Sequence, residues 1–307
     1  MKVYLSEYID PAAVELLRSR AEITDSFDQS EEIDAIILRN IPVTAELMDR
    51  CKNLKVIGKH GVGVNTIDVA AAKERGIQVI YTPTANADSV AEMTVALFMA
   101  LARKIPLANT NCARGAYTSI APKELIGTEI SGKTLGQIGM GNIAQRVARI
   151  LRDGFGCRIL GYDPFISAED AAARGFEKVD ELYELLERSD LVNINVPLVK
   201  STEYMIDAAA FSHFKSGALF VNAARGAVIR EDALYEALVS GKVKAAACDT
   251  FVSEPPKGDN PLQSLPNFIA TPHIGGNTEE ALQRTGKEVV EDVFRVLDGQ
   301  EPVHPAI

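Results

Sequence analysis

Short, fully apolar runs separated by helix-like stretches are the feature that most limits how this chain can fold. A first series comprises runs at 2–5, 35–38, 54–58 and 77–81, with a helix-like segment at 11–18. A second series predicts strands at 134–139, 157–163, 191–196, 218–222, 245–249 and 267–271. Fully apolar strands that alternate with helices are typical of parallel sheets covered on both faces. The sequence therefore predicts an α/β protein with two doubly wound parallel-sheet domains.

Two long helix-like stretches, at 89–103 and 279–297, read as connectors between the domains. We expect the second of them to return to the first domain, which makes that domain discontinuous. The predicted domains are 1–98 plus 284–307, and 99–283. The length of 307 residues is consistent with two domains. The cleft between them is the expected binding site.

The charge and the cysteines exclude several classes of protein. The net charge of −10 disfavours a nucleic-acid partner, because an acidic surface repels phosphate backbones. No two of the four cysteines have the spacing of a metal or redox motif, which predicts reduced thiols and no metal site. The cysteines are Cys51, Cys112, Cys157 and Cys248. Without a signal peptide or an apolar run long enough to span a membrane, we expect a cytoplasmic protein with no membrane partner.

A glycine turn follows the predicted strand at 134–139. Its small residues are Gly139, Gly141 and Ala144 in the spacing GxGxxA, which also fits an ordinary strand-to-helix turn. Here an acid, Asp163, ends the next strand about 20 residues later, where a carboxylate can bind ribose hydroxyls. The helix N-terminus would face the pyrophosphate. The pattern predicts NAD as cofactor, and the carboxylate argues against NADP because it would repel a 2′-phosphate.

Three residues with catalytic side chains follow strands of the second series. His273 suits acid–base chemistry, Glu254 can orient an imidazole, and the planar fork of Arg225 suits a carboxylate. Each also has a plain structural explanation, as a loop cap, a solvated glutamate or a surface ion pair. Ligands of open α/β sheets bind outside the carboxyl ends of strands. Together the three predict hydride transfer at an alcohol carbon.

Four ordered segments carry a resemblance that covers nearly the whole chain. They are TLGQIGMGNIA (134–144), NAARGAVI (222–229), CDTFVSEPP (248–256) and TPHIGG (271–276). In this order they resemble the D-isomer-specific 2-hydroxyacid dehydrogenases, in the phosphoglycerate dehydrogenase-like branch.

The resemblance implies two Rossmann-like domains, with a substrate domain built from both chain termini and an NAD-binding domain between them. The family's catalytic residues fall on Arg225, Glu254 and His273. Its cofactor contacts fall on Gly139, Gly141, Asn142, Ile143, Asp163, Val196, Pro197, Ala223, Arg225, Asp249, His273 and Gly276. Among these, Asp249 is expected to orient the nicotinamide carboxamide. The resemblance also implies a homodimer joined through the region after the first connector helix.

The stretch 59–68 resembles the family's substrate loop. Amides near Val62 and Gly63 would receive the substrate carboxylate as an anion nest, together with Arg225. Arg39 resembles a basic substrate-side residue, and Lys59 stands where phosphoglycerate-specific enzymes usually carry arginine. His60 replaces a small residue and is expected to shape the loop. The cations suggest a second anionic group on the substrate, and phosphate is one candidate.

The predicted function is an NAD-dependent oxidoreductase that acts on a small, anionic 2-hydroxy or 2-oxo acid. The candidate substrates are of the 3-phosphoglycerate, glycerate or hydroxypyruvate, glyoxylate and sulfolactate types. Two alternatives stay open: an NAD-sensing binding protein such as a co-repressor, and a formate or phosphite dehydrogenase on the same scaffold. Because the sequence stops at 307, we expect a short form without the family's C-terminal regulatory domains.

Overall fold

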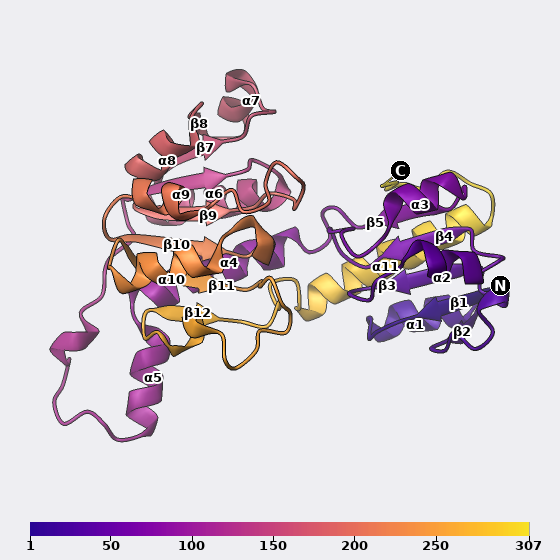
Figure 1. Cartoon of the computed structure of the whole chain (residues 1–307), viewed down its shortest axis with the longest axis horizontal. Coiled ribbons are helices and arrows are strands. Elements are labelled where there is room, and N and C mark those ends of the chain that lie inside the picture. The colour runs from indigo at the N-terminus through magenta and orange to yellow at the C-terminus, as the bar shows by residue number, and fades with distance from the viewer. Residues whose placement is uncertain (307) are drawn as a thin grey trace. The chain divides into compact units, whose positions relative to one another are not determined.

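The computed structural model describes residues 1–306, which form two units (Figure 1). Unit 1 comprises residues 1–89 and the C-terminal residues from Gly276, and unit 2 comprises Val90–Gly275. The sequence places the divisions at 98/99 and 283/284, inside helices α4 (Ala87–Ala102) and α11 (Glu279–Leu297). The difference arises because helical periodicity does not show which core a helix packs against. Most of α4 packs in unit 2, whereas α11 packs in unit 1.

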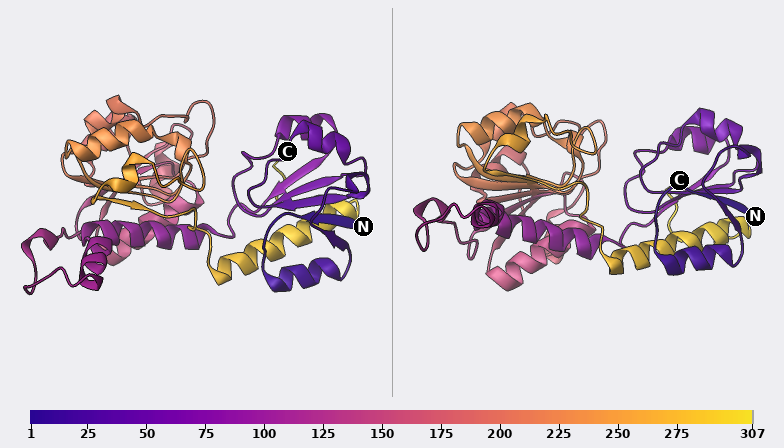
Figure 2. Two further views of the ribbon diagram at one scale, coloured as in Figure 1. Left: turned by 60° about the horizontal axis from the view of Figure 1, so that its bottom comes forward. Right: turned by 90° about the horizontal axis from the view of Figure 1, so that it is seen from below.

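Unit 1 is a five-stranded parallel sheet with the strand order β2-β1-β3-β4-β5. Besides α11, its elements are β1 (Lys2–Leu5), α1 (Pro11–Arg18), β2 (Glu22–Thr24), β3 (Ala35–Leu38), α2 (Ala45–Arg50), β4 (Val56–Lys59), α3 (Val69–Glu74) and β5 (Gln78–Tyr81). Side chains of β3 alternate between two cores: Ile36 packs with α2 and α3, and Ile37 with α1 and α11. Helices therefore cover both faces of this sheet (Figure 2), as the apolar runs predict.

Unit 2 is a seven-stranded parallel sheet with the order β12-β11-β10-β9-β6-β7-β8. Its strands are β6 (Thr134–Ile138), β7 (Arg158–Tyr162), β8 (Glu177–Lys178), β9 (Leu191–Ile194), β10 (Ala218–Asn222), β11 (Val243–Cys248) and β12 (Phe268–Ala270). Its further helices are α5 (Ile105–Ala113), α6 (Asn142–Phe155), α7 (Ala168–Ala173), α8 (Leu182–Arg188), α9 (Ala208–His213) and α10 (Glu231–Val239).

The two faces of the second sheet are also covered by different helices. In β10, Phe220 packs on the side of α8, α9 and α10, while Leu219 and Val221 pack on the side of α4 and α6. The predicted fold class, two Rossmann-like doubly wound domains, is confirmed. The consequence for function is that every strand of unit 2 ends at one edge of the sheet, where the loops can share a site.

Helix α11 lies against β4 at a position without a side chain. A Cβ atom at Gly58 would lie 2.8 Å from Val293 Cγ2 and 2.9 Å from Val289 Cγ2. Both valines are buried in the core of unit 1 and have few rotamers. By contrast, Gly154 near the end of α6 is exposed, and a Cβ there would meet nothing within 4 Å.

The same substitution at these two glycines should change stability in opposite directions. We expect Gly58→Ala to destabilise the chain by about 1–3 kcal/mol, because the added methyl overpacks the β4–α11 contact. Gly154→Ala should stabilise it by up to about 1 kcal/mol, because alanine restricts the unfolded chain and favours the helix. Thermal unfolding of both variants measures this. A Gly58→Ala protein as stable as the unsubstituted chain would contradict the packing of α11.

Candidate active site

The glycine turn lies between β6 and α6 and has the geometry that a dinucleotide pyrophosphate requires. Gly139 has a φ of 85°, and a Cβ there would lie 2.5 Å from the carbonyl oxygen of Asn195. Only glycine fits both conditions. At Gly141, the N-cap of α6, a Cβ would meet nothing within 4 Å, so the backbone is open to a ligand. Ala144 is buried against the sheet. The open backbone at a helix N-terminus fits a phosphate.

Asp163 follows β7 and faces the glycine turn. Its carboxylate accepts hydrogen bonds from the amides of Met140 (3.1 Å) and Phe165 (3.0 Å). These bonds tie the acid to the backbone of the turn. The guanidinium of Arg174 also reaches the turn and donates to the carbonyl oxygen of Met140 (3.1 Å). The sequence analysis did not single out this arginine, because it lies 34 residues from its partner.

The other predicted cofactor residues of unit 2 lie after strand ends or at the start of α6. A Cβ at Gly139 would lie 3.1 Å from Val196, so that side chain borders the turn. The residues that follow the strands or open the helix are Asn142, Ile143, Pro197 and Ala223. Gly276 instead belongs to unit 1, where a Cβ would lie 2.8 Å from Asn86 Nδ2.

Arg225 is presented by a turn at the end of β10. The side chain of the buried Asn222 accepts from the amide of Ala224 (3.0 Å) and donates to the carbonyl oxygen of Arg225 (3.0 Å). The guanidinium donates to the carbonyl oxygen of Ala224 (2.6 Å). Burial lowers the pKa of Arg225, and the nearby Glu254 opposes that shift. An arginine stays charged even so, and unit 2 therefore holds a half-buried cation next to an acid.

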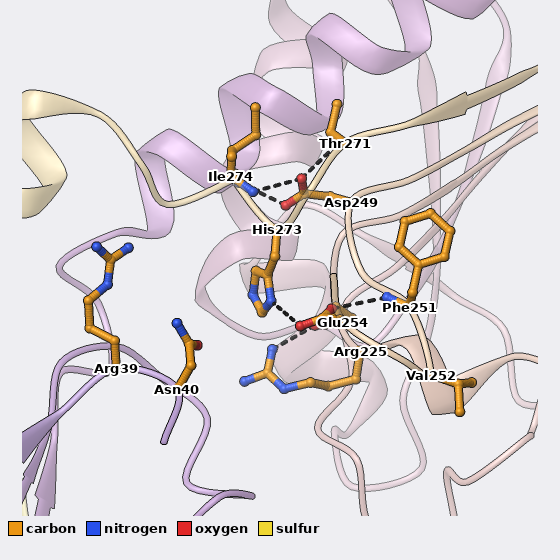
Figure 3. A network of polar contacts seen from close by, with 12 residues as sticks. Arg39, Asn40, Arg225, Asp249, Phe251, Val252, Glu254, Thr271, His273 and Ile274 are labelled. Atoms are coloured by element: carbon orange, nitrogen blue, oxygen red, sulfur yellow. Dashed lines mark hydrogen bonds and ion pairs between the residues drawn. The ribbon is translucent and has the colours of Figure 1, made fainter. Parts of the chain in front are cut away.

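Glu254 and His273 form a hydrogen-bonded pair (Figure 3). The Nδ1 atom of His273 lies 2.8 Å from Glu254 Oε2, while Oε1 accepts from the amide of Phe251 (3.0 Å). Burial alone would raise the pKa of Glu254. The hydrogen bonds from His273 and Phe251 and the charge of Arg225 outweigh burial, so the pKa is lowered. The acid is therefore held ionised beside the imidazole.

A second carboxylate, Asp249, holds the loop that carries His273. It is 1% exposed and accepts from Thr271 Oγ1 (2.6 Å), the amide of Ile274 (2.9 Å) and the amide of Gly275 (2.8 Å). Its own carbonyl oxygen accepts from the amide of His273 (2.8 Å). Figure 3 shows this carboxylate turned toward the loop. The structure thus gives Asp249 a loop-holding role, and the predicted contact with the carboxamide stays a prediction.

His273 has a φ of 56°, in the left-handed region that few side-chain-bearing residues adopt. Such a conformation persists only where its surroundings impose it. The hydrogen bonds to Asp249 supply that constraint on both sides of the residue. The imidazole is thereby directed toward Glu254 (Figure 3).

The predicted substrate-side residues lie in unit 1, at the ends of β3 and β4. The ammonium of Lys59, whose residue is 7% exposed, donates to the carbonyl oxygen of Arg39. The guanidinium of Arg39 donates to the carbonyl oxygen of Tyr8 (3.2 Å). Val62 and Gly63 are half-buried. Lys59 is therefore at least partly structural, and substrate contacts for these four residues stay predictions.

His60 is buried near these cations, and its role in shaping the loop stays a prediction. Burial lowers its pKa to about 4, and Arg39 and Lys59 contribute to the same shift, so the imidazole is neutral at physiological pH. The next residue, Gly61, exchanges hydrogen bonds with Thr82: the Gly61 amide donates to Thr82 Oγ1 (2.9 Å).

The structure thus brings together Arg225, Glu254 and His273, as their positions after strand ends predict. Reasoning from the sequence missed the residues that hold them. Gly226 is one: a Cβ there would lie 1.9 Å from the backbone carbon of Phe251. A glycine directly after a candidate catalytic arginine was the available signal, since close backbone contact is a common reason for glycine. Thr271 and Gly275 lie in the quoted segment TPHIGG, but that segment did not indicate their hydrogen bonds to Asp249.

Comparisons with known proteins identify a family and similar relatives. The family described as D-isomer specific 2-hydroxyacid dehydrogenase, NAD binding domain, matches residues 95–275. A D-3-phosphoglycerate dehydrogenase of Methanocaldococcus jannaschii is 41% identical over 98% of this chain and 58% of its own length. A hydroxypyruvate reductase of Thermotoga maritima is 41% identical over 96% of this chain and 98% of its own length.

A solved structure, the TT0316 protein from Thermus thermophilus, has a TM-score of 0.92 and 32% identity, with 100% of both chains covered. The chain spans little more than half the length of the curated phosphoglycerate dehydrogenases that it matches. Within residues 1–306, none of the helices has the length and apolarity needed to cross a bilayer.

The match to the NAD-binding domain confirms the predicted cofactor, and the relatives confirm the phosphoglycerate dehydrogenase-like branch. This chain belongs to the D-isomer-specific 2-hydroxyacid dehydrogenase family.

Proposed function

We propose that this chain is an NAD-dependent oxidoreductase that transfers a hydride between nicotinamide and a small, anionic 2-hydroxy acid. The observation that carries the proposal is the His273–Glu254 pair, 2.8 Å apart, with the guanidinium of Arg225 acting on the same carboxylate. An acid–base, its orienting acid and a carboxylate anchor are the groups that oxidation of an alcohol carbon next to a carboxylate needs.

Each of the three residues has one role in the oxidation direction. Arg225 holds the substrate carboxylate through its planar fork. Because Nδ1 of His273 is bonded to Glu254, Nε2 is the nitrogen that removes the hydroxyl proton, and Glu254 stabilises the imidazolium that forms. Bound NAD would supply the acceptor for the hydride that leaves the carbon bearing the hydroxyl. In reduction, Nε2 of protonated His273 returns the proton to the carbonyl oxygen.

The glycine turn and Asp163 are the parts of unit 2 that would hold the cofactor. The open backbone at Gly141 and the N-terminus of α6 suit the pyrophosphate, and Asp163 suits the ribose hydroxyls. The contacts proposed beside them are those of Gly139, Asn142, Ile143, Val196, Pro197, Ala223, Arg225, Asp249, His273 and Gly276.

The substrate is proposed to be a 2-hydroxy or 2-oxo acid with a second polar or anionic group. The positive charges of Arg39 and Lys59, at the carboxyl ends of the neighbouring strands β3 and β4, support a second anionic group on the substrate. The amides near Val62 and Gly63 are proposed to receive a carboxylate. The candidate classes are 3-phosphoglycerate, glycerate or hydroxypyruvate, glyoxylate and sulfolactate.

The proposal includes a cytoplasmic homodimer. The region after α4 exposes large apolar side chains, Ile105, Ile120 and Ile126, which is typical of a surface that a partner covers. The four cysteines are free, as in a reducing compartment.

The test of the proposed function is consumption of NADH with a panel of 2-oxo acids: hydroxypyruvate, 3-phosphohydroxypyruvate, glyoxylate and sulfopyruvate. Turnover of any of these supports the proposal and ranks the substrates. NADH binding without turnover of any panel member would instead favour a sensor of NAD. Oxidation of formate or phosphite with NAD, together with no turnover of the four 2-oxo acids, would favour a formate or phosphite dehydrogenase.

Replacing His273 should abolish most of the activity. We expect His273→Ala to lower kcat by about a hundredfold or more, because general acid–base catalysis by a positioned side chain contributes that much. The matched control is His213→Ala. His213 also lies 2.7 Å from a glutamate, Glu187, but on α9 and outside the strand-end loops, so kcat should be unchanged. Equal activity of the two variants would rule out the role of His273.

Replacing Asp163 should weaken the preference for NADH over NADPH. We expect Asp163→Ser to change the ratio of kcat/KM values toward NADPH by about tenfold or more. The variant loses the repulsion of a 2′-phosphate, and Arg174 supplies a cation at the same turn. The control is Asp180→Asn, which removes one negative charge at an exposed acid that pairs with Lys178 and should leave the ratio unchanged. An unchanged ratio in Asp163→Ser would contradict the ribose contact.

A further inference from the structure

The segment that carries Glu254 is held by very little packing. Val252, Ser253, Glu254 and Pro255 are all exposed, and most residues up to Asn260 are too. An exposed segment with few buried contacts opens at low cost in free energy. The Glu254 carboxylate must nevertheless stay within hydrogen-bonding distance of His273 for the proposed function. Hydrogen bonds therefore have to supply the order that burial does not.

One side chain outside this segment, Glu231 at the start of α10, binds both of its ends. Its Oε1 atom accepts from the amide of Val252 (2.9 Å), and its Oε2 atom accepts from Asn260 Nδ2 (2.8 Å). Asn260 is fixed in turn, because its Oδ1 atom accepts from the amide of Leu262 (3.1 Å), a fully buried residue. A single carboxylate thus closes the loop 252–260 between its first and last residues.

The Phe251–Val252 peptide is also in contact with the loop that carries Arg225. A Cβ at Gly226 would lie 2.3 Å from the carbonyl oxygen of Phe251 and 2.3 Å from the nitrogen of Val252, so the two backbones are in contact. The amide of Phe251 then donates to Glu254 Oε1. Contacts thus run from Glu231 through this peptide to Glu254 and on to His273.

We propose that Glu231 is a positioning residue that holds the 251–254 turn so that the Glu254 carboxylate meets the imidazole of His273. The inference rests on the proposed function for its kinetic consequence, but its structural part can be measured without turnover. Glu231 acts on the catalytic side chains through the backbone that it binds.

A simpler explanation is that Glu231 only stabilises α10, because an acid in the first turn interacts favourably with the helix dipole. Asp232, the next residue, shares that helix turn and that charge but pairs with Arg230. If the helix dipole were the whole role, Asp232→Asn and Glu231→Gln would have similar effects. Asp232→Asn is therefore the matched control.

The hydrogen bonds that Glu231 forms with Val252 and Asn260 can be tested by swapping the acid and the amide between positions 231 and 260. In Glu231→Gln, the new amide can still accept from Val252, but its NH₂ group faces the NH₂ group of Asn260. In Asn260→Asp, two carboxylates face each other. In the double variant Glu231→Gln with Asn260→Asp, the amide at 231 donates to the carboxylate at 260, which still accepts from Leu262. Each single variant breaks the contact between residues 231 and 260, and the double variant restores it.

The experiment measures kcat, NADH affinity and thermal unfolding for the four combinations and for Asp232→Asn. We expect Glu231→Gln and Asn260→Asp each to lower kcat about tenfold, since the free energy of one lost charge-assisted hydrogen bond corresponds to a rate change of that size. The double variant should return to within about threefold of the unsubstituted protein. NADH affinity should stay within about twofold throughout, because the glycine turn is not touched. Asp232→Asn should leave kcat unchanged.

Hydrogen exchange of the Phe251 amide separates this inference from the proposed function. Glu231 does not bind that amide, so faster exchange reports loss of the Glu254 contact. We expect exchange about tenfold faster in each single variant and normal exchange in the double variant, whether or not the protein turns over any panel substrate. The inference is wrong if the Phe251 amide exchanges at the same rate in all variants, or if the double variant shows no recovery.

Discussion

The buried carboxylate of Asp249 is the constraint on which the site depends. A charge that is almost wholly removed from water must be satisfied by hydrogen bonds. Here the donors come from Thr271, Ile274 and Gly275, all from one short loop after β12. Satisfying the charge therefore fixes the loop, and fixing the loop imposes the left-handed conformation of His273. The direction of the imidazole follows from that conformation.

The parallel topology of unit 2 explains why three loops far apart in the sequence can meet. Strands β10, β11 and β12 are neighbours in one sheet, and their carboxyl ends lie at one edge. Arg225 follows β10, Glu254 follows β11 and His273 follows β12. The missing side chain of Gly226 lets the first two loops touch backbone to backbone. The chemistry is thus assembled by neighbouring strand ends, as is general for open α/β sheets.

The sequence predicts most of the fold because buried parallel strands leave an unmistakable apolar pattern. The runs at 2–5, 35–38 and 218–222 match β1, β3 and β10 in full, and the segment at 279–297 matches α11. The strands β2 and β8 were missed because they are short, lie at sheet edges and contain polar residues at exposed positions. Such strands carry too few buried residues to show a pattern.

The sequence identifies the catalytic side chains but not the residues that hold them. A motif shows residue types, whereas a hydrogen-bond partner 21 residues away, as Val252 is from Glu231, leaves no local pattern. In the sequence Glu231 is an ordinary acid in the first turn of a helix. Asp249 suggested a cofactor contact because the resemblance places one there, and only the coordinates reveal its three loop donors. Lys59 stays a predicted substrate ligand, and its hydrogen bond to the carbonyl oxygen of Arg39 left no local pattern in the sequence.

The most direct test of the account compares the unsubstituted protein with Glu254→Gln across pH. The pKa of Glu254 is lowered from its ordinary value of 4.5, so the carboxylate is charged at neutral pH and loses that charge as the pH falls through the lowered pKa. The ratio of the two kcat/KM values for NADH-dependent 2-oxo acid reduction isolates that charge. The account predicts a ratio of about tenfold or more at neutral pH, which falls toward one as the pH falls through the lowered pKa of Glu254. A ratio near one at neutral pH would contradict the claim that an ionised Glu254 orients His273 for catalysis.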